Sequence, residues 1–176
     1  TGRAASESAV DIAIVGGGMV GVSLALLLSH LRLGWRIRII ESFPLQSNAA
    51  LPPSFDGRST ALSHSSREIF ELLGLWQSLD EGLTEIRQVH VSDRGHFGRT
   101  RLTAAEQNLP ALGYVVENRQ LGDVLMAALQ RAPDVELTAP AQVAAVSPSS
   151  GGMQLQVSSD GTDAVEMISA DLLVVA

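Results

Sequence analysis

The chain has 176 residues, of which 45% are hydrophobic and 18% charged, a composition typical of one globular domain with a sizeable core. Its net charge of −7 argues against a nucleic-acid partner, whose phosphates require a basic surface, but leaves a membrane partner open. Cysteine is absent, which excludes disulfides, thiol catalysis and cysteine-ligated metals, and the four histidines show no metal-site spacing.

Residues 1–9 are small and polar and carry no signal-peptide pattern, so we expect a disordered N-terminus and a cytoplasmic protein. The apolar run Val10–Val15 predicts a buried parallel strand. A helix is expected over Met19–Leu33, too short to span a bilayer and ended by Gly34. A second strand is expected over Trp35–Ile40, completing a βαβ unit.

The turn between the first strand and the helix reads Gly-Gly-Gly-Met-Val-Gly and satisfies the pattern G-x-G-x-x-G. Gly16 permits the tight turn, Gly18 lets a diphosphate approach the backbone, and Gly21 lets the helix pack on the sheet. Glu41 follows 20 residues after Gly21, where a carboxylate accepts hydrogen bonds from ribose hydroxyls and repels a 2′-phosphate. The pattern therefore predicts bound FAD or NAD rather than NADP, and it does not separate the first two.

After this unit the pattern predicts a long functional loop, Ser42–Gly57, and then a helix from Ser59 to Leu73. Period-two alternation from Glu85 predicts a β-hairpin with its turn at Asp93–Gly95. The remaining expected elements, in chain order, are a helical turn at Trp76–Leu79, a strand at Tyr114–Val116, a helix at Asn118–Arg131, a strand at Val135–Leu137, a three-stranded meander at Gln142–Val146, Gly152–Ser158 and Ala164–Ser169 with a turn at Asp160-Gly161, and a buried strand at Leu172–Val175.

Five stretches carry a resemblance to a known family. They are IVGGGMVG (14–21), FDGRSTAL (55–62), LGLWQSL (73–79), VHVSDRGHFG (89–98) and ALGYVVEN (111–118). Together they resemble the flavoprotein aromatic hydroxylases of the para-hydroxybenzoate hydroxylase type, within the ubiquinone-biosynthesis branch. The resemblance covers the chain from Val10 onward and corresponds to the N-terminal part of a longer protein.

The resemblance implies an α/β fold with a Rossmann-like FAD-binding βαβ unit, a parallel sheet, a three-stranded meander and part of a substrate-domain sheet. It implies an FAD-binding segment at 10–83, the start of the substrate-domain sheet at 84–117, and a continued FAD-binding segment at 118–176. The resemblance also implies that the chain ends before this domain is complete.

The resemblance also implies the residues that hold FAD. Arg58 would pair with the pyrophosphate, Asn118 would contact the ribityl-phosphate region, and Val143 would lie against the adenine. From the residues alone, Arg58 also reads as a surface residue at a helix start and Asn118 as a helix N-cap. No catalytic residue or metal ligand is assigned. The full set of implied cofactor-binding residues is Gly16, Gly18, Met19, Val20, Gly21, Glu41, Ser42, Arg58, Asn118, Val143 and Ala176.

The implied activity is FAD-dependent hydroxylation of a prenylated phenol in ubiquinone biosynthesis, with NADPH and O₂ as co-substrates. We expect this chain alone to be inactive, and the whole protein to lie in the cytoplasm with a peripheral contact to the inner membrane or to a biosynthetic complex. Two alternatives remain open from the residues: an NAD-dependent dehydrogenase, and a non-catalytic nucleotide-binding scaffold.

Overall fold

The computed structural model describes residues 7–45, 53–79, 82–92, 95, 98–159 and 165–176. The chain divides into two compact units, and each is described by itself. The first comprises residues 1–56 and 125–176, and the second comprises residues 57–124. These boundaries differ from the predicted ones, because residues 57–83 group with the predicted substrate-domain strands rather than with the FAD-binding segment.

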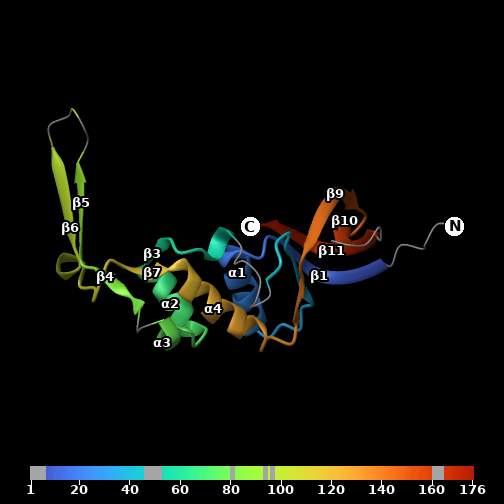
Figure 1. Cartoon of the computed structure of the whole chain (residues 1–176), viewed down its shortest axis with the longest axis horizontal. Coiled ribbons are helices and arrows are strands. Elements are labelled where there is room, and N and C mark those ends of the chain that lie inside the picture. The colour runs from blue at the N-terminus through green and yellow to red at the C-terminus, as the bar shows by residue number, and fades with distance from the viewer. Residues whose placement is uncertain (1–6, 46–52, 80–81, 93–94, 96–97, 160–164) are drawn as a thin grey trace. The chain divides into compact units, whose positions relative to one another are not determined.

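The first unit contains a six-stranded sheet in the order β8-β2-β1-β11-β10-β9 (Figure 1). β1 is parallel to both β2 and β11, and β2 is parallel to β8, whereas β11, β10 and β9 pair antiparallel. The predicted βαβ unit and meander are therefore confirmed as parts of one sheet. The elements are β1 (Glu7–Val15), α1 (Met19–His30), β2 (Ile37–Ile40), β8 (Val135–Thr138), β9 (Ala141–Ser149), β10 (Gly152–Ser159) and β11 (Val165–Val175).

β1 begins three residues earlier than the apolar run predicted. Its first residues pair with β11, Glu7 opposite Met167 and Ser8 opposite Ile168, so residues 7–9 are strand rather than a disordered terminus. The apolar pattern did not predict this part of the strand, because hydrogen bonding to β11, and not apolar burial, holds it in place. Residues 1–6 lie outside the described part of the chain.

α1 ends at His30, three residues before the predicted end at Leu33. Arg32 takes a positive φ of 52° and Gly34 one of 74°, so the reversal into β2 begins before the glycine that the pattern marks as the stop. β2 starts at Ile37 instead of Trp35, and all four of its residues are buried. The exposed Leu31, Leu33 and Trp35 are thus connector residues whose apolar character imitates helix and strand.

β11 is one continuous strand where the pattern predicted two, at Ala164–Ser169 and Leu172–Val175. Residues 165–170 pair antiparallel with β10, while β1 pairs in parallel along most of the strand. Along β11 the sequence changes from alternating to continuous apolar residues. This change occurs because the neighbouring strands change, and not because one strand ends and another begins. The predicted Asp160-Gly161 turn before it lies outside the described residues.

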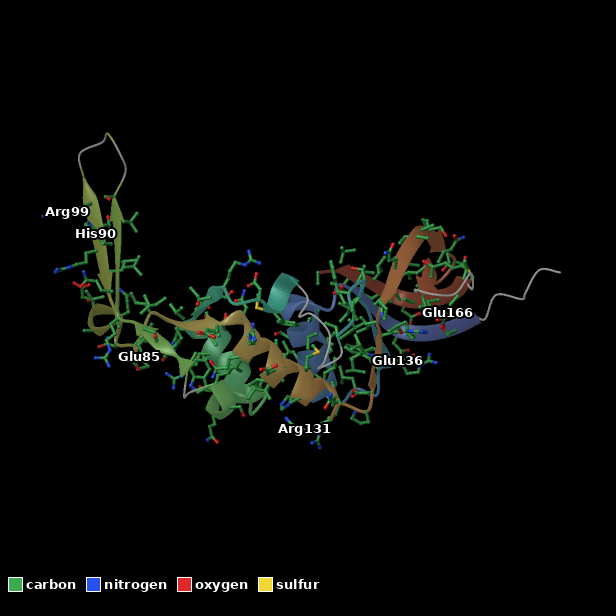
Figure 2. The ribbon with its side chains drawn as sticks, in the orientation of Figure 1. Glu85, His90, Arg99, Arg131, Glu136 and Glu166 are labelled. Atoms are coloured by element: carbon green, nitrogen blue, oxygen red, sulfur yellow. The ribbon has the colours of Figure 1, made fainter. Side chains whose placement is uncertain are left out.

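An ion pair between a buried arginine and a half-buried glutamate crosses this sheet. Arg38 on β2 is 6% exposed and donates from two nitrogens to the two carboxylate oxygens of Glu166 on β11, at 2.7 and 2.8 Å. The same guanidinium donates to the Thr138 hydroxyl on β8 at 2.9 Å and to the Ser8 hydroxyl on β1 at 3.1 Å. Figure 2 marks Glu166 and Glu136, the second carboxylate near Arg38 at 3.5 Å. One side chain therefore connects four strands.

The second unit contains a three-stranded antiparallel sheet in the order β3-β7-β4 and a separate hairpin of β5 and β6. The hairpin and the strand at 113–117 confirm the predicted ones, although residues 93 and 94 of the predicted turn lie outside the described part. The elements are β3 (Ser59–Ser63), α2 (His64–Leu72), α3 (Trp76–Leu79), β4 (Thr84–Ile86), β5 (Gln88–Ser92), β6 (Arg99–Thr103), β7 (Gly113–Glu117) and α4 (Asn118–Leu129), whose end belongs to the first unit.

The prediction of a helix from Ser59 is wrong for its first five residues. Ser59–Ser63 forms β3 and pairs antiparallel with β7, and α2 begins at His64, with the Ser63 hydroxyl accepting the backbone N–H of Ser66 at 3.1 Å. Leu62 and Phe70 fit helical spacing, but pairing with a strand about 50 residues away in the sequence decides the outcome. Tertiary pairing here overrides the local pattern.

α2 is fixed to the sheet by a cationic side chain between two rings. The Arg67 guanidinium lies 5.4 Å from the ring centres of both Trp76 and Tyr114, and it donates to the Tyr114 hydroxyl. The two rings meet edge to face at 4.8 Å. Hydrogen bonding to Glu71 contributes most to raising the pKa of Arg67. The cluster keeps this helix packed on β7.

We expect Glu166→Gln to lower the free energy of unfolding at neutral pH by about 3 kcal/mol, since Arg38 would stay buried without its carboxylate. Burial favours the neutral form of Glu166, but hydrogen bonds from Arg38 and Ser8 and the charge of Arg38 outweigh it and lower the pKa of Glu166 below its ordinary 4.5. The stabilisation is therefore complete above pH 4.5 and is lost as the pH falls through the lower folded pKa.

Urea unfolding across this pH range measures the effect, and the gap between wild type and Glu166→Gln should close in acid. The exposed pair of Arg36 and Asp11 supplies the control, because Asp11→Asn should change stability much less than Glu166→Gln does. A gap that is independent of pH would show that the carboxylate charge is not the stabilising feature.

Candidate cofactor site

The turn from β1 into α1 leaves no space for side chains at two of its glycines. Gly16 has a φ of 115°, and a Cβ there would collide with the carbonyl oxygen of Ala176. A Cβ on Gly21 would collide with the carbonyl of Gly16. The expected tight turn and the expected close approach of helix and strand are both present. The end of β11 helps to impose the tight turn.

The start of α1 is open to an anion. Gly18 is the N-cap residue in extended conformation, no side chain caps the helix, and its first turn has no acidic residue. The first intrahelical bond runs from the Val22 N–H to the Gly18 carbonyl at 3.0 Å, so the earlier N–H groups of the turn have no intrahelical acceptor. Backbone donors and the positive end of the helix dipole fit a diphosphate.

Ser54 lies directly over this turn. It belongs to the short helix η1 (Pro53–Phe55) in the loop after β2, and a Cβ on Gly18 would lie 2.9 Å from its hydroxyl oxygen. Phe55 beside it is 1% exposed and anchors this part of the loop. The loop that the sequence predicts to be functional therefore places a hydroxyl beside the glycine turn, although residues 46–52 lie outside the described part.

Glu41 directly follows β2, and its carboxylate lies against the glycine turn. One oxygen accepts the Gly17 N–H at 2.6 Å, and the other accepts the Phe43 N–H at 2.8 Å and the Ser42 hydroxyl at 3.1 Å. A carboxylate offers about four acceptor positions, so these three bonds leave one for a ribose hydroxyl. Glu41 therefore lies beside the glycine turn, and Ser42 contacts its carboxylate.

The other predicted residues of the first unit occupy the same sheet and turn. Ala176 donates its N–H to the Val15 carbonyl at 2.9 Å, beside Gly16. Val143 on β9 is partly buried against the core, and two residues before it the Ala141 N–H donates to the Glu41 carbonyl at 2.7 Å. In the first turn of α1, Met19 is partly buried and Val20 is 69% exposed.

Arg58 and Asn118 come together in the second unit. The Asn118 N–H donates to the Arg58 carbonyl at 2.8 Å, and its side chain is bonded to the Thr60 hydroxyl at 2.6 Å. Asn118 is 4% exposed, whereas Arg58 is exposed in the segment before β3. The predicted helix-start setting of Arg58 is wrong, because a strand follows it, whereas Asn118 does open α4.

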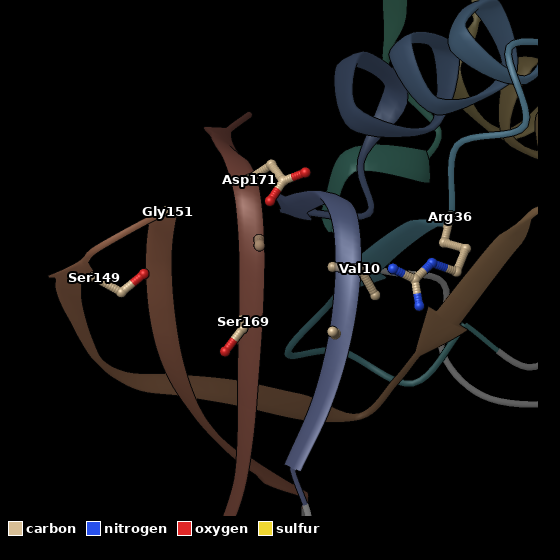
Figure 3. A pocket seen from close by; sticks show the side chains of 8 residues that line it. Val10, Arg36, Ser149, Gly151, Ser169 and Asp171 are labelled. Atoms are coloured by element: carbon tan, nitrogen blue, oxygen red, sulfur yellow. The ribbon is translucent and has the colours of Figure 1, made fainter.

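Two further hollows lie away from the glycine turn. One, of about 160 Å³, is lined by Val10, Arg36, Ser149, Ser169 and Asp171 among others (Figure 3). The other, of about 460 Å³, lies on the hairpin and is lined by Gln88, His90, Arg99 and Arg101; His90 and Arg99 are marked in Figure 2. In the described residues no three His, Asp or Glu side chains group as metal ligands.

The pattern did not find Ser54 and Thr60. Each lies near a predicted site residue only because a distant segment folds against it: the loop after β2 onto Gly18, and β3 onto β7. Their hydroxyls resemble those of any polar loop or strand. The local signal for Ser54 was its position directly after the proline pair Pro52-Pro53, inside a loop expected to be functional.

A family model described as an FAD binding domain matches residues 9–176. The chain belongs to this FAD-binding family. Its cofactor is therefore FAD, which decides between the two nucleotides that the glycine pattern left open, and the bare turn, uncapped helix and Glu41 fit that group.

Curated relatives confirm the ubiquinone-biosynthesis branch. The chain is 32% identical over 141 residues to ubiquinone hydroxylase UbiL of Rhodospirillum rubrum, covering 80% of this chain and 32% of that protein. It is 36% identical over 138 residues to 3-demethoxyubiquinol 3-hydroxylase of Escherichia coli, covering 77% and 34%. The chain thus spans about a third of the length of the curated relatives it matches.

Solved structures agree on the fold. The flavin-dependent monooxygenase PieE, in complex with FAD and substrate, matches 96% of this chain and 30% of its own with a TM-score of 0.73 at 20% identity. Anhydrotetracycline hydroxylase OxyS of Streptomyces rimosus matches 96% and 31% with a TM-score of 0.73 at 17% identity. Across the described residues, no helix is both long and apolar enough to cross a bilayer.

Substitutions in the turn should separate folding from cofactor binding. Gly21→Ala forces a methyl group into the Gly16 carbonyl, and we expect a loss of about 2 kcal/mol or more in unfolding free energy. Gly18→Val meets only the movable Ser54 side chain, so the fold should persist while FAD affinity falls about tenfold or more, because the side chain covers the diphosphate donors.

Thermal unfolding followed by circular dichroism, together with FAD titration followed by flavin fluorescence, measures both effects. Gly151→Ala is the matched control, because a Cβ there meets nothing within 4 Å. Normal FAD affinity in Gly18→Val would show that the diphosphate does not rest on this turn.

Proposed function

We propose that this sequence forms the FAD-binding part of a monooxygenase that hydroxylates a prenylated phenol in ubiquinone biosynthesis, using NADPH and O₂. The observation that carries the proposal is the uncapped N-terminus of α1 beside a Glu41 carboxylate that keeps one free acceptor position. Similarity to ubiquinone hydroxylases along about four fifths of the chain supports the reaction class.

The proposed roles follow from where each group lies. The N–H groups at Gly18, Met19 and Val20 bind the diphosphate, and Glu41, held by its backbone donors, accepts from the adenosine ribose. The backbone near Val143 borders the adenine, and Ala176 closes the turn at Gly16. Bound FAD would supply the redox chemistry that activates O₂; these residues bind and orient it.

In the second unit we propose that the Arg58 guanidinium pairs with pyrophosphate oxygens and that Asn118 hydrogen-bonds the ribityl-phosphate region. A planar guanidinium binds two oxygens of one phosphate at once, which suits the first role. The burial of Asn118 and its bonds to neighbouring backbone and hydroxyl groups hold its amide rigid, which suits the second.

The substrate proposal is a phenol with a polyprenyl tail. The stretches at 55–58 and 89–98 most resemble 2-octaprenyl-6-methoxyphenol hydroxylase, which favours a methoxyphenol ring. Because such a tail partitions into lipid, we propose a cytoplasmic protein that works at the inner membrane or within a biosynthetic complex, without a nucleic-acid partner.

We expect Glu41→Gln to weaken FAD binding about tenfold. Both carboxylate oxygens of Glu41 accept backbone N–H groups, so the NH₂ group of a glutamine would have to face one of these donors. Parallel titrations of FAD and NAD measure it. Glu68→Gln, at an exposed carboxylate on α2, should leave FAD affinity unchanged. Binding of NAD without FAD would instead support the dehydrogenase alternative.

The full-length protein should purify yellow and should oxidise NADPH when a prenylated phenol is added, giving a hydroxylated ring in mass spectra of the product. The 176-residue chain alone should show no hydroxylation, since it spans about a third of its relatives. A colourless full-length protein that takes up no added FAD would refute the proposal. Unchanged quinone synthesis in cells carrying Gly18→Val would favour the scaffold alternative.

A further inference from the structure

The side chain of Ser54 lies against the cofactor turn at Gly18. A Cβ built on Gly18 would lie 2.9 Å from the Ser54 hydroxyl oxygen and 3.4 Å from the Ser54 Cβ. Among the described residues, leaving out the two chain neighbours of the glycine, no other residue comes within 4 Å of this point. At Gly16 and Gly21 the nearest atom to such a Cβ is instead a backbone carbonyl oxygen. The open face of the turn at Gly18 is therefore bordered by a hydroxyl.

The local structure keeps this hydroxyl near the turn. Ser54 is the middle residue of η1, and the side chain of Phe55, next to it in the chain, is fully buried. Ser54 and Gly18 also belong to the same compact unit. Because a buried ring anchors the chain one residue away, the position of the Ser54 hydroxyl is set by the packing of this unit.

The same region of the turn carries the unpaired donors of α1. Gly18 is the N-cap residue, and the N–H groups that precede Val22 in the turn have no intrahelical acceptor. A diphosphate bound there approaches the bare backbone of Gly18, which is the face that Ser54 borders. A serine hydroxyl rotates about its Cβ–Oγ bond and carries one proton, so it is able to donate to a phosphate oxygen within its reach.

We propose that the Ser54 hydroxyl donates a hydrogen bond to a diphosphate oxygen of bound FAD. The inference rests on the proposed diphosphate site at α1 and adds to it a donor from the loop after β2. The backbone N–H groups of α1 and the Ser54 hydroxyl then bind the diphosphate together. Since a hydroxyl is neutral, this donor strengthens phosphate binding without forming an ion pair with the nearby carboxylate of Glu41.

Ser54→Ala in the full-length protein tests the proposal. It removes the donor and keeps the Cβ, and the FAD dissociation constant should rise about tenfold, because a hydrogen bond to a charged phosphate is lost. Titration of the apoprotein with FAD, followed by flavin fluorescence, measures the constant. Ser147→Ala, at an exposed serine on β9, is the matched control and should leave it unchanged. Affinity in Ser54→Ala equal to wild type overturns the proposal, and tighter binding would show that Ser54 obstructs the diphosphate.

Competition with ADP locates the contact on the cofactor. ADP carries the adenosine and the diphosphate of FAD but lacks the flavin. If Ser54 donates to the diphosphate, Ser54→Ala should weaken the displacement of FAD by ADP in proportion to the loss of ADP affinity, which should match the loss of FAD affinity within about twofold. Unchanged ADP affinity beside weakened FAD affinity would place the contact on the flavin half and overturn the proposal.

Gly18→Ala tests the geometry of the contact. The φ of −75° and ψ of −172° at Gly18 suit an alanine, and the new methyl group would meet only the Ser54 side chain, which must move. With the hydroxyl already displaced, adding Ser54→Ala should weaken FAD binding by less than about twofold further. Losses that multiply in full in the double variant would show that Ser54 does not act at Gly18.

The same titrations separate this proposal from the proposed function. If Ser54→Ala binds FAD normally while Glu41→Gln and Gly18→Val do not, the role of Ser54 is refuted and the FAD enzyme stands. If the wild-type full-length protein binds no FAD, both are refuted.

Discussion

The rest of the structure depends on the crowding at the turn between β1 and α1. The carbonyls of Gly16 and Ala176 occupy the positions where Cβ atoms of Gly21 and Gly16 would lie. Helix and strand can approach this closely only with bare backbone, and that approach points the unpaired N–H groups of α1 outward together. Because β11 ends against the turn, the last strand of the sequence helps to build the site that the first strand opens.

The meander is joined to this site by charge as well as by hydrogen bonds. The Arg38–Glu166 pair bridges β2 and β11, the strands on either side of β1, while Ser8 and Thr138 complete the donor and acceptor set. β2 then delivers Glu41 to the turn, three residues beyond Arg38. A polar network thus keeps strands without a shared apolar pattern in register. If one partner of the network were missing, the pairing of these strands would be disrupted.

The sequence alone predicts the parts of this fold whose signals are local. The glycine turn, Glu41, the helix after it and the hairpin each depend on residues within one stretch, and all are present. The strand at Ser59–Ser63, the unbroken β11 and the hydroxyls of Ser54 and Thr60 depend on partners 30 to 60 residues away or more. The periodicity of the sequence does not indicate those partners. It therefore predicted a helix where β3 forms and two strands where the single strand β11 forms.

A chain of net charge −7 that binds a diphosphate must counter its own field locally. The first turn of α1 has no acidic residue, and the nearby Glu41 carboxylate already accepts N–H bonds from Gly17 and Phe43, which draw its charge toward the backbone. Backbone dipoles at short range outweigh a net charge that is spread over the surface and screened by salt. The acidic composition therefore argues against extended polyanions but not against a single dinucleotide, because the proposed recognition rests on fixed peptide groups rather than on the sum of side-chain charges.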